Sequence, residues 1–268
     1  HPHIGLSTLT YLFDGEIMHR DSLGSEQPIR PGEVNWMTAG RGVTHSERFE
    51  YARREGGPVH GVQAWVALPD AEEECAPAFS HHQRDDLPGF DEAGVRGRLV
   101  AGKVLGFEAA VPTHSPLFYL HWDLAAGART ELPAEYPERA IYVVTGEIEV
   151  GGQRFEAGRM LVLSPGAPLA ITALAPSVVM AVGGEPVGPR FIDWNFVSSS
   201  RERIEEAKAG RRAERKRPRL APQVEGGPRP AAVQEEPHRQ EGPDDREEFR
   251  CRIDVPGRGT LGEHHEVE

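Results

Sequence analysis

Short apolar runs separated by turn-forming residues fill the first 198 residues of the chain. Gly, Pro and Asp residues stand between the runs, and no long segment shows the spacing of an amphipathic helix. This pattern is typical of β-strands joined by tight turns. The clearest runs are Leu9–Phe13, Val62–Leu68, Leu117–Trp122, Ala140–Val144, Met160–Leu163 and Val178–Val182. We therefore expect an all-β body, built as a sandwich or barrel.

Two segments of this body are repeated. The sequence YLFDGEI at residues 11–17 returns as YVVTGEI at residues 142–148. Similarly, PGEVNWMTAG at residues 31–40 matches AGRMLVLSPG at residues 157–166. In each copy a Gly precedes a strand-like run and a second Gly follows it. A repeat of this kind predicts two similar β-barrels in tandem.

The chain changes character near residue 199. Residues 199–217 combine Arg, Lys, Glu and Ala at helical pairing distances, which predicts a polar helix. Residues 218–268 are rich in Pro, Gly, Glu and Arg and contain few aromatic side chains. Such a segment buries too little apolar surface to offset the entropy lost on ordering, so we expect a disordered tail.

Composition narrows the class of function. The net charge of −12 does not favour nucleic acids or acidic membranes as partners, and no apolar run is long enough to span a bilayer. The two cysteines, Cys75 and Cys251, lie in dissimilar contexts, which argues against a disulfide scaffold and for a reduced, cytoplasmic setting. We expect a monomer with no direct nucleic-acid binding and no membrane association.

Four residues in two short motifs could bind one metal ion. One residue separates His1 from His3, and one separates His45 from Glu47. Residues i and i+2 of a strand point to the same face, so each motif can direct two ligands at one ion. Three imidazoles and one carboxylate suit Fe(II), with Mn, Ni, Cu and Zn as alternatives. These four residues are called the predicted ligand set. Four protein ligands leave two positions of an octahedral ion open, which is typical of catalysis or ligand exchange.

The repeat distinguishes the two barrels. Aligning Gly15 with Gly146, and Gly40 with Gly166, gives each member of the predicted ligand set a counterpart in the second barrel. All four counterparts are apolar: Leu132, Ala134, Ile171 and Ala173. We therefore expect the second barrel to keep the scaffold without a metal site.

Apolar side chains near the site could line a pocket. If strand alternation continues from His1 and His3, then Leu9, Tyr11 and Phe13 share the face of these histidines. The three side chains would then form the wall of a substrate pocket for a flat aromatic ligand. Ordinary core packing gives the same pattern, so both interpretations stay open.

Longer segments resemble the pirin family, a branch of the cupin superfamily. HPHIGLSTLTYLFDGEIMHRDSLG at residues 1–24 and IRPGEVNWMTAGRGVTHSE at residues 29–47 resemble the pirin signature. GVQAWVALP at residues 61–69 and FIDWNFVSSSRERIEEAKA at residues 191–209 are also similar to pirin segments. The resemblance implies a bicupin fold, with iron held in the first cupin by the predicted ligand set. Pirins carry residues before the HPH motif, so the chain resembles a pirin that is truncated at its N-terminus.

The resemblance and the repeat together divide the chain into segments. We expect an N-terminal metal-binding cupin domain at residues 1–69, truncated at its start, and an inter-domain connection at residues 70–104. A C-terminal cupin domain without metal ligands would occupy residues 105–198. The polar helix (199–217) and the disordered tail (218–268) complete the expected organisation.

The resemblance implies two classes of function. Bacterial pirins resemble quercetin 2,3-dioxygenases, also called flavonol 2,4-dioxygenases. In such an enzyme the metal binds the 3-hydroxyl of a flavonol, Glu47 takes its proton as general base, and O2 opens the ring with loss of carbon monoxide. Other pirins resemble iron-dependent, redox-sensing transcription cofactors, or regulators that bind a metabolic enzyme directly. The fold is common to both classes and does not decide between them.

Overall fold

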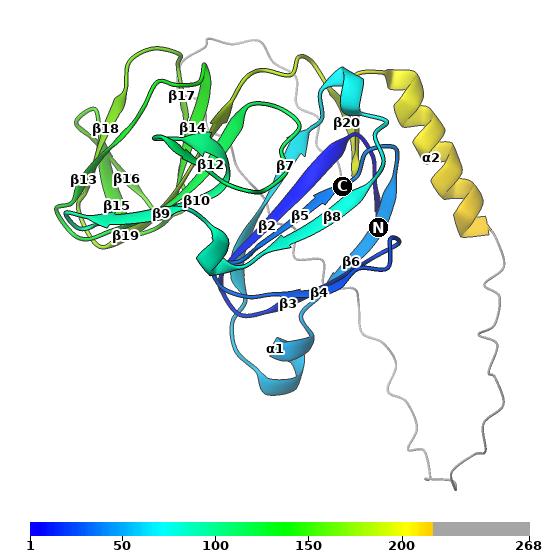
Figure 1. Cartoon of the computed structure of the whole chain (residues 1–268), viewed down its shortest axis with the longest axis horizontal. Coiled ribbons are helices and arrows are strands. Elements are labelled where there is room, and N and C mark those ends of the chain that lie inside the picture. Colours follow the sequence, from blue (N-terminus) through cyan, green and yellow to red (C-terminus); the bar gives the residue numbers. More distant parts are fainter. Residues whose placement is uncertain (217–268) are drawn as a thin grey trace, which may run out of the picture. The chain divides into compact units, whose positions relative to one another are not determined.

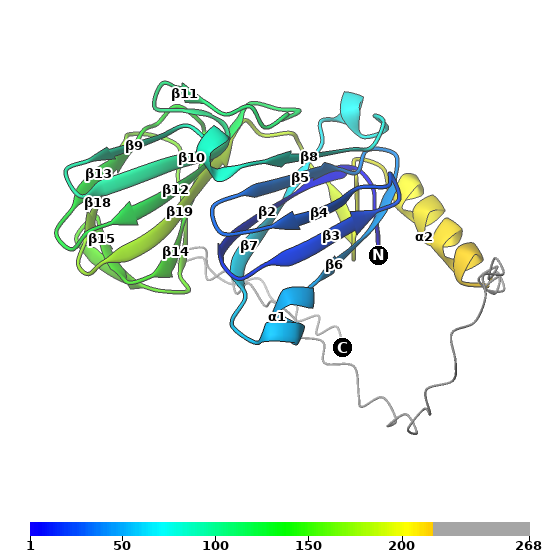
Figure 2. The same ribbon diagram turned by 60° about the horizontal axis from the view of Figure 1, so that its bottom comes forward.

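The computed structural model describes residues 1–216 of the chain. Strands dominate this part of the molecule, and two α-helices accompany them. Figures 1 and 2 show the strands gathered in two barrels, one drawn mainly in blue and cyan and the other mainly in green. The expected all-β fold with two tandem barrels is confirmed. Within residues 1–216, no helix is long and apolar enough to cross a membrane.

The N-terminal barrel consists of two four-stranded antiparallel sheets. Their strand orders are β1-β6-β3-β4 and β7-β2-β5-β8. The strands are β1 (Pro2–His3), β2 (Leu6–Asp14), β3 (Ile17–Asp21), β4 (Glu26–Ile29), β5 (Val34–Thr38), β6 (Val43–Arg48), β7 (His60–Ala67) and β8 (Ala78–His82). The short helix α1 (Glu50–Glu55) and a 3-10 turn (Asp70–Glu72) lie in its connections.

The C-terminal barrel is built in the same way. One sheet has the order β13-β18-β15-β16, and the other contains the path β11-β10-β12-β19-β14-β17 with β9 paired to β10. The strands are β9 (Gly89–Glu92), β10 (Val95–Val104), β11 (Phe107–Glu108), β12 (Leu117–Leu124), β13 (Arg129–Leu132), β14 (Glu138–Thr145), β15 (Glu147–Val150), β16 (Gln153–Glu156), β17 (Met160–Leu163), β18 (Leu169–Ala173) and β19 (Ser177–Gly184). A 3-10 turn (Arg84–Asp86) precedes β9.

The chain then returns to the first barrel. The hairpin of β20 (Phe191–Asp193) and β21 (Phe196–Ser198) leads into helix α2 (Arg201–Lys216). Ile204 of α2 and Phe196 of β21 pack with Ile4, which follows β1 directly. The expected helix at 199–217 corresponds to α2, whereas the expected disordered tail at 218–268 lies outside the described residues.

The sequence repeat is a repeat of topology. The order β1-β6-β3-β4 in the first barrel corresponds strand by strand to β13-β18-β15-β16 in the second. The two glycines that anchor the repeat also match, because Gly15 and Gly146 have φ angles of +82° and +84°. At each of them an added Cβ would collide with a proline carbonyl oxygen, that of Pro58 or Pro176.

The two barrels share one hydrophobic core. Buried side chains from one face of the β7-β2-β5-β8 sheet, among them Leu9 and Trp36, belong to the same cluster as Leu99 and Trp122 of the second barrel. A polar contact crosses this interface, because the Tyr11 hydroxyl lies 2.8 Å from a ring nitrogen of His121.

The structure divides residues 70–104 differently from the expected inter-domain connection. Strand β8 pairs with β5 and completes a sheet of the first barrel. Strands β9 and β10 pair with each other, and β10 pairs with β12 of the second barrel. Turn residues around Pro88 and Gly94, and the charged residues within β10, make these strands hard to recognise from apolar runs alone.

Alanine at the two repeat glycines should destabilise the fold more than alanine at an open glycine. Gly24, with a φ of +92° and no atom within 4 Å of an added Cβ, provides the matched control. Gly24→Ala should cost about 1–2 kcal/mol through its backbone conformation alone. Gly15→Ala and Gly146→Ala should each cost roughly 1–3 kcal/mol more through the carbonyl collision, as measured by urea unfolding. Equal losses at all three positions would contradict the packing described for the two turns.

Candidate metal centre

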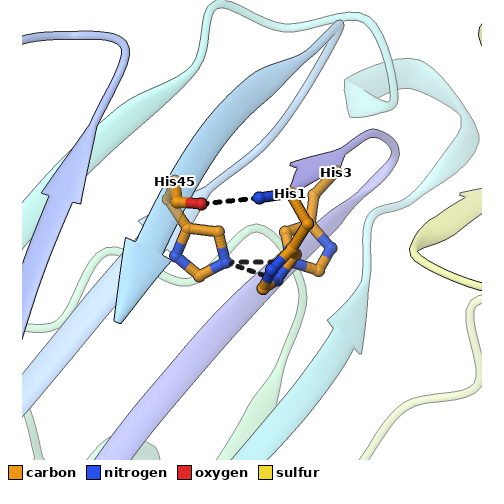
Figure 3. Close-up of side chains that lie close together, drawn as sticks. All are labelled: His1, His3 and His45. Carbon is orange, nitrogen blue, oxygen red and sulfur yellow. Dashed lines mark hydrogen bonds between the residues drawn. The ribbon is translucent and has the colours of Figure 1, made fainter. Parts of the chain in front are cut away.

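Three imidazoles of the first barrel point toward one another, as Figure 3 shows. The Nε2 atom of His45 lies 3.1 Å from Nε2 of His3 and 2.9 Å from Nε2 of His1. Ligand atoms bonded to one ion at 2.0–2.1 Å, with angles of 90–109°, lie about 2.9–3.4 Å apart. The three nitrogens therefore have the spacing of adjacent ligands on a single metal ion.

Neighbouring strands deliver these histidines. His3 is on β1 and His45 is on β6, and the two strands are paired through His3 and Val43. The backbone amide of His45 donates a hydrogen bond to the carbonyl of His1 at 2.9 Å, which fixes the first motif beside the second. His3 and His45 are buried, while His1 is exposed.

Burial keeps the two inner imidazoles neutral. It lowers the pKa of His3 from 6.5 to about 4 and that of His45 from 6.5 to about 3. The ring Nδ1 of His3 lies 3.1 Å from the backbone carbonyl of Asn195, which can only accept a hydrogen bond. The His3 proton therefore resides on Nδ1, and the lone pair of Nε2 is left for a metal.

Glu47 lies beside the imidazole cluster in a second, overlapping group. Its carboxylate accepts hydrogen bonds from the Thr10 hydroxyl at 3.0 Å and from the Gln63 amide at 2.7 Å. Ligand atoms of Glu47, His45 and His19 all lie within 4.8 Å of one another, as do those of His45 and the other two histidines of the predicted ligand set. The four predicted residues thus fall into two groups that share His45.

His19 is a functional candidate that the sequence did not reveal, because it stands alone there. It is on β3, paired with Glu47 on β6, so both side chains point to the same face. Its Nε2 atom lies 3.0 Å from a carboxylate oxygen of Asp21, and its ring stacks on Phe79 with centroids 4.4 Å apart. His19 therefore belongs to the wall of the site.

Strand register identifies the second-barrel counterparts of these side chains. β13 pairs with β18 as β1 pairs with β6, and β15 pairs with β18 as β3 pairs with β6. The counterparts are four apolar side chains with exposed fractions of 0%: Leu132 for His3, Ile148 for His19, Ile171 for His45 and Ala173 for Glu47. Apolar core fills the second barrel where the first has ligands.

For one strand this register corrects the glycine alignment, which pairs Leu132 with His1 and Ala134 with His3. The structure makes Leu132 the counterpart of His3, and Ala134 lies beyond the end of β13. The reason is a longer connection, because 14 residues lead from Leu132 to the repeat glycine, against 12 residues from His3.

Leu9, Tyr11 and Phe13, the expected pocket wall, lie on the face of β2 that points away from the imidazole cluster. Thr10 points toward Glu47, so its neighbours along the strand point the other way. Leu9 and Tyr11 are buried in the core shared with the second barrel, and Phe13 packs against that core. The prediction that these three side chains share the face of His1 and His3 is therefore wrong.

Gly5 explains this reversal. It has a φ of +66°, and an added Cβ would collide with the carbonyl oxygen of Val197. The chain turns at Gly5 between β1 and β2, and its amide donates to the carbonyl of Gly40 at 2.9 Å. Alternation restarts after this turn, so parity counted from the first motif does not carry into β2.

Two tryptophans flank the imidazole cluster instead. The Trp65 ring lies edge-on to His3 with centroids 5.3 Å apart, and the Trp194 ring lies 6.2 Å from that of His1. Their side chains are large yet 43% and 49% exposed. Trp194 also adopts a φ of +52°, which is unusual for a bulky residue, at the tip of the β20–β21 hairpin. Both belong to segments that resemble pirins.

Two tandem cupin barrels with an imidazole cluster in the first define a bicupin protein. The Pirin family model matches residues 1–66, and the model of the Pirin C-terminal cupin domain matches residues 119–216. A pirin-like protein of Caulobacter vibrioides is 57% identical over 216 residues, which are 80% of this chain and 75% of that protein. The chain belongs to the pirin family.

Solved structures show the same similarity. A quercetin 2,3-dioxygenase from Acinetobacter baumannii has a TM-score of 0.75 at 29% identity, covering 80% of this chain and 77% of that one. A second structure of a quercetin 2,3-dioxygenase from the same organism has a TM-score of 0.72 at 32% identity, covering 89% and 79%.

The metal-free protein should lose stability on acidification because of His3 and His45. Their pKa values are about 4 and about 3 in the folded state, against 6.5 when unfolded. Below pH 6.5 the unfolded chain binds more protons at these residues, so the free energy of unfolding should fall as the pH drops toward 3. Urea unfolding across this range measures the fall. It should be smaller in a His3→Gln/His45→Gln variant, and identical slopes would contradict the proposed neutral state.

Proposed function

We propose that this pirin is a metal-dependent dioxygenase that cleaves a flat, hydroxylated aromatic substrate of the flavonol class, such as quercetin. The observation that carries the proposal is the convergence of three imidazole nitrogens, because Nε2 of His1 and Nε2 of His3 both lie within 3.1 Å of Nε2 of His45. The Glu47 carboxylate, fixed by hydrogen bonds, lies beside them. The similarity to two structures of quercetin 2,3-dioxygenases supports it.

The donor set fits a divalent transition metal. The inner histidines are neutral, and His45 Nδ1 is buried without a hydrogen-bond partner among the described residues. His1, His3 and His45 would hold the ion, and Glu47, which shares a second group of ligand atoms with His45, would complete the set. Three nitrogens and a carboxylate favour Fe(II), with other divalent ions as alternatives. Once bound, the metal supplies Lewis acidity that lowers the pKa of a substrate hydroxyl.

In this proposal Glu47 takes the proton of that hydroxyl. Its carboxylate is fixed by Thr10 and Gln63, and the Gln63 amide also lies 3.0 Å from the Thr10 hydroxyl. Both contacts donate to the carboxylate and keep it oriented toward the imidazole side. Glu47 lies two residues after His45 on the same strand, so it can accept the proton without a rearrangement of the barrel strands.

The two tryptophans suit a flat aromatic ligand. Trp65 and Trp194 present large apolar surfaces beside His3 and His1, on the side of the cluster that solvent reaches. Stacking on such rings orients a planar substrate and limits water near its reacting carbon atoms. These two residues replace the substrate wall expected from the sequence.

A second candidate function is regulation through protein binding. The β20–β21 hairpin links the metal centre to the surface, because Asn195 contacts His3 while Ile192 and Trp194 are 68% and 49% exposed. A change of charge at the metal would then reach an apolar surface on the same hairpin. This observation favours a redox-sensing transcription cofactor, or a regulator that binds a metabolic enzyme, as the alternative.

One experiment separates the two candidates. Iron-loaded protein is incubated with quercetin under air while the visible absorbance of quercetin and the dissolved O2 are followed. The dioxygenase proposal expects both to fall together, and a His3→Ala/His45→Ala variant to show neither change. Stable absorbance with the iron in place would reject the enzyme and leave regulation.

Glu47→Gln should retain the fold and lose activity. The amide keeps the shape of the side chain but cannot accept the substrate proton as a carboxylate does, so turnover should fall on the order of 100-fold or more. Glu108→Gln, at the exposed strand β11 of the second barrel, is the matched control. Elemental analysis of both variants reports any loss of metal. Normal turnover in Glu47→Gln with normal iron content would remove Glu47 from the mechanism.

Trp65→Leu and Trp194→Leu should weaken substrate binding more than turnover. Loss of one aromatic contact costs about 0.5–1.5 kcal/mol, so KM for quercetin should rise roughly 2- to 12-fold in each variant. Val162→Ala, which removes an exposed apolar side chain of the second barrel, is the control and should leave KM unchanged. A KM equal to that of the unmodified protein in both tryptophan variants would place the substrate elsewhere.

A further inference from the structure

A second cluster of metal-binding side chains lies outside the imidazole cluster. Ligand atoms of Glu72, Cys75 and His114 all lie within 4.8 Å of one another. All three side chains are partly buried and remain accessible to solvent. They come from two segments that are about 40 residues apart in sequence, so the fold rather than local sequence brings them together.

A tight turn sets the first two ligands side by side. Glu72 ends the 3-10 turn that begins at Asp70, and the amide of Cys75 donates to the carbonyl of Glu72 at 3.1 Å. Residues three apart in such a turn lie on the same side. His114 reaches the pair from the loop before β12, and its Nδ1 atom lies 3.6 Å from a carboxylate oxygen of Glu72.

This separation suits shared coordination better than a hydrogen bond. At 3.6 Å, His114 Nδ1 and the Glu72 oxygen are beyond the usual range of an N–H···O hydrogen bond, about 2.7–3.2 Å. Nitrogen and oxygen ligands on a tetrahedral ion, with bonds of 2.0–2.2 Å, lie about 3.3–3.6 Å apart.

A buried hydroxyl can set the tautomer of His114 for metal binding. The Oγ1 atom of Thr38 lies 3.2 Å from His114 Nε2 and 3.1 Å from the Ser7 hydroxyl, and it accepts a hydrogen bond from the Trp36 indole at 3.0 Å. A hydroxyl has one donor and two acceptor sites. If Thr38 donates to Ser7 and accepts from Trp36 and His114, all its sites are used and His114 Nδ1 keeps its lone pair for a metal.

We propose that Glu72, Cys75 and His114 form a second metal site that takes a borderline-soft divalent cation such as Zn²⁺. Thiolate, imidazole and carboxylate are the three ligand types that zinc uses in proteins, and the solvent-accessible side of the cluster leaves a fourth position for water. The cation displaces the thiol proton of Cys75 to solvent and forms a bond to the thiolate. The imidazole cluster has no sulfur, so the two sites differ in the metals they prefer.

The same residues suit a reactive cysteine poorly. Burial and the nearby Glu72 carboxylate raise the pKa of the Cys75 thiol, so without a cation the thiol stays protonated and is a weak nucleophile. A cation reverses this preference, because its charge neutralises Glu72 and stabilises the thiolate.

The second site adjoins the turn that leads to the first. The amide of Arg41 donates to the carbonyl of Cys75 at 3.0 Å, and an added Cβ on Gly40 would collide with that carbonyl. This turn leads directly into β6, which carries His45. A cation bound at Cys75 would therefore brace the turn that positions the imidazole cluster.

Cobalt provides the test, because a thiolate ligand gives Co²⁺ an intense near-ultraviolet charge-transfer band that nitrogen and oxygen ligands do not give. The full chain, stripped of metal by a chelator, is titrated with Co²⁺ under reducing conditions. We expect the intensity of the band to saturate when one Co²⁺ per chain is bound through sulfur. Added Zn²⁺ should displace this cobalt and abolish the band.

Substitutions show which residues bind the cobalt that gives the charge-transfer band. Cys75→Ser should abolish it, whereas Cys251→Ser, the matched control at the other cysteine, should leave it unchanged. His114→Ala and Glu72→Gln should weaken cobalt binding at the band at least tenfold. His3→Ala/His45→Ala should keep the band, so failure here is distinguishable from failure of the proposed dioxygenase.

A measurement on the unmodified chain covers the case in which Cys75→Ser does not fold. Zn²⁺ should slow alkylation of Cys75 but not that of Cys251, as followed by mass spectrometry of the two peptides. The proposal is overturned if no charge-transfer band forms, if the band survives in folded Cys75→Ser, or if Zn²⁺ leaves the alkylation rate of Cys75 unchanged.

Discussion

The alternation of side chains along β2 is the constraint on which both halves of the molecule depend. Its Thr10 face holds Glu47 inside the first barrel, and its Tyr11 face packs into the core shared with the second. A shift by one residue would exchange the two faces and place apolar rings at the candidate metal centre. The turn at Gly5 sets this alternation, and its carbonyl neighbour at Val197 leaves no room for a side chain. Site and interface are thus fixed by the same strand.

The two barrels show what the scaffold requires and what the chemistry adds. Four positions that carry His3, His19, His45 and Glu47 in one barrel carry fully buried apolar residues in the other. The second barrel gains a continuous core, which stabilises it. The first gives up that core for buried imidazoles whose pKa values are held low. A continuous apolar core and a set of candidate metal ligands are therefore divided between two copies of one fold.

Local patterns predicted much of this arrangement. The apolar runs and the repeat predicted two β-barrels, and the HPH and HSE motifs predicted the segments that meet at the site. The predicted alternation of side-chain faces was wrong beyond Gly5. This residue has a left-handed backbone conformation, which breaks the strand alternation between β1 and β2. His19 and Asn195 were missed because neither belongs to a local sequence motif. Strand pairing brings His19 to the site, and a hairpin distant in sequence brings Asn195.

The hydrogen bond between His3 and Asn195 has a consequence for synthesis. Its partners are 192 residues apart, so the ribosome releases the two histidine motifs long before the carbonyl that orients His3. At about 5–20 residues per second, the interval is roughly 10–40 s. During this time the second barrel emerges and the hairpin behind it does not yet exist. The nascent protein therefore exposes the histidines first and completes the candidate metal centre last, so the arrangement of its three imidazoles is a late step of maturation.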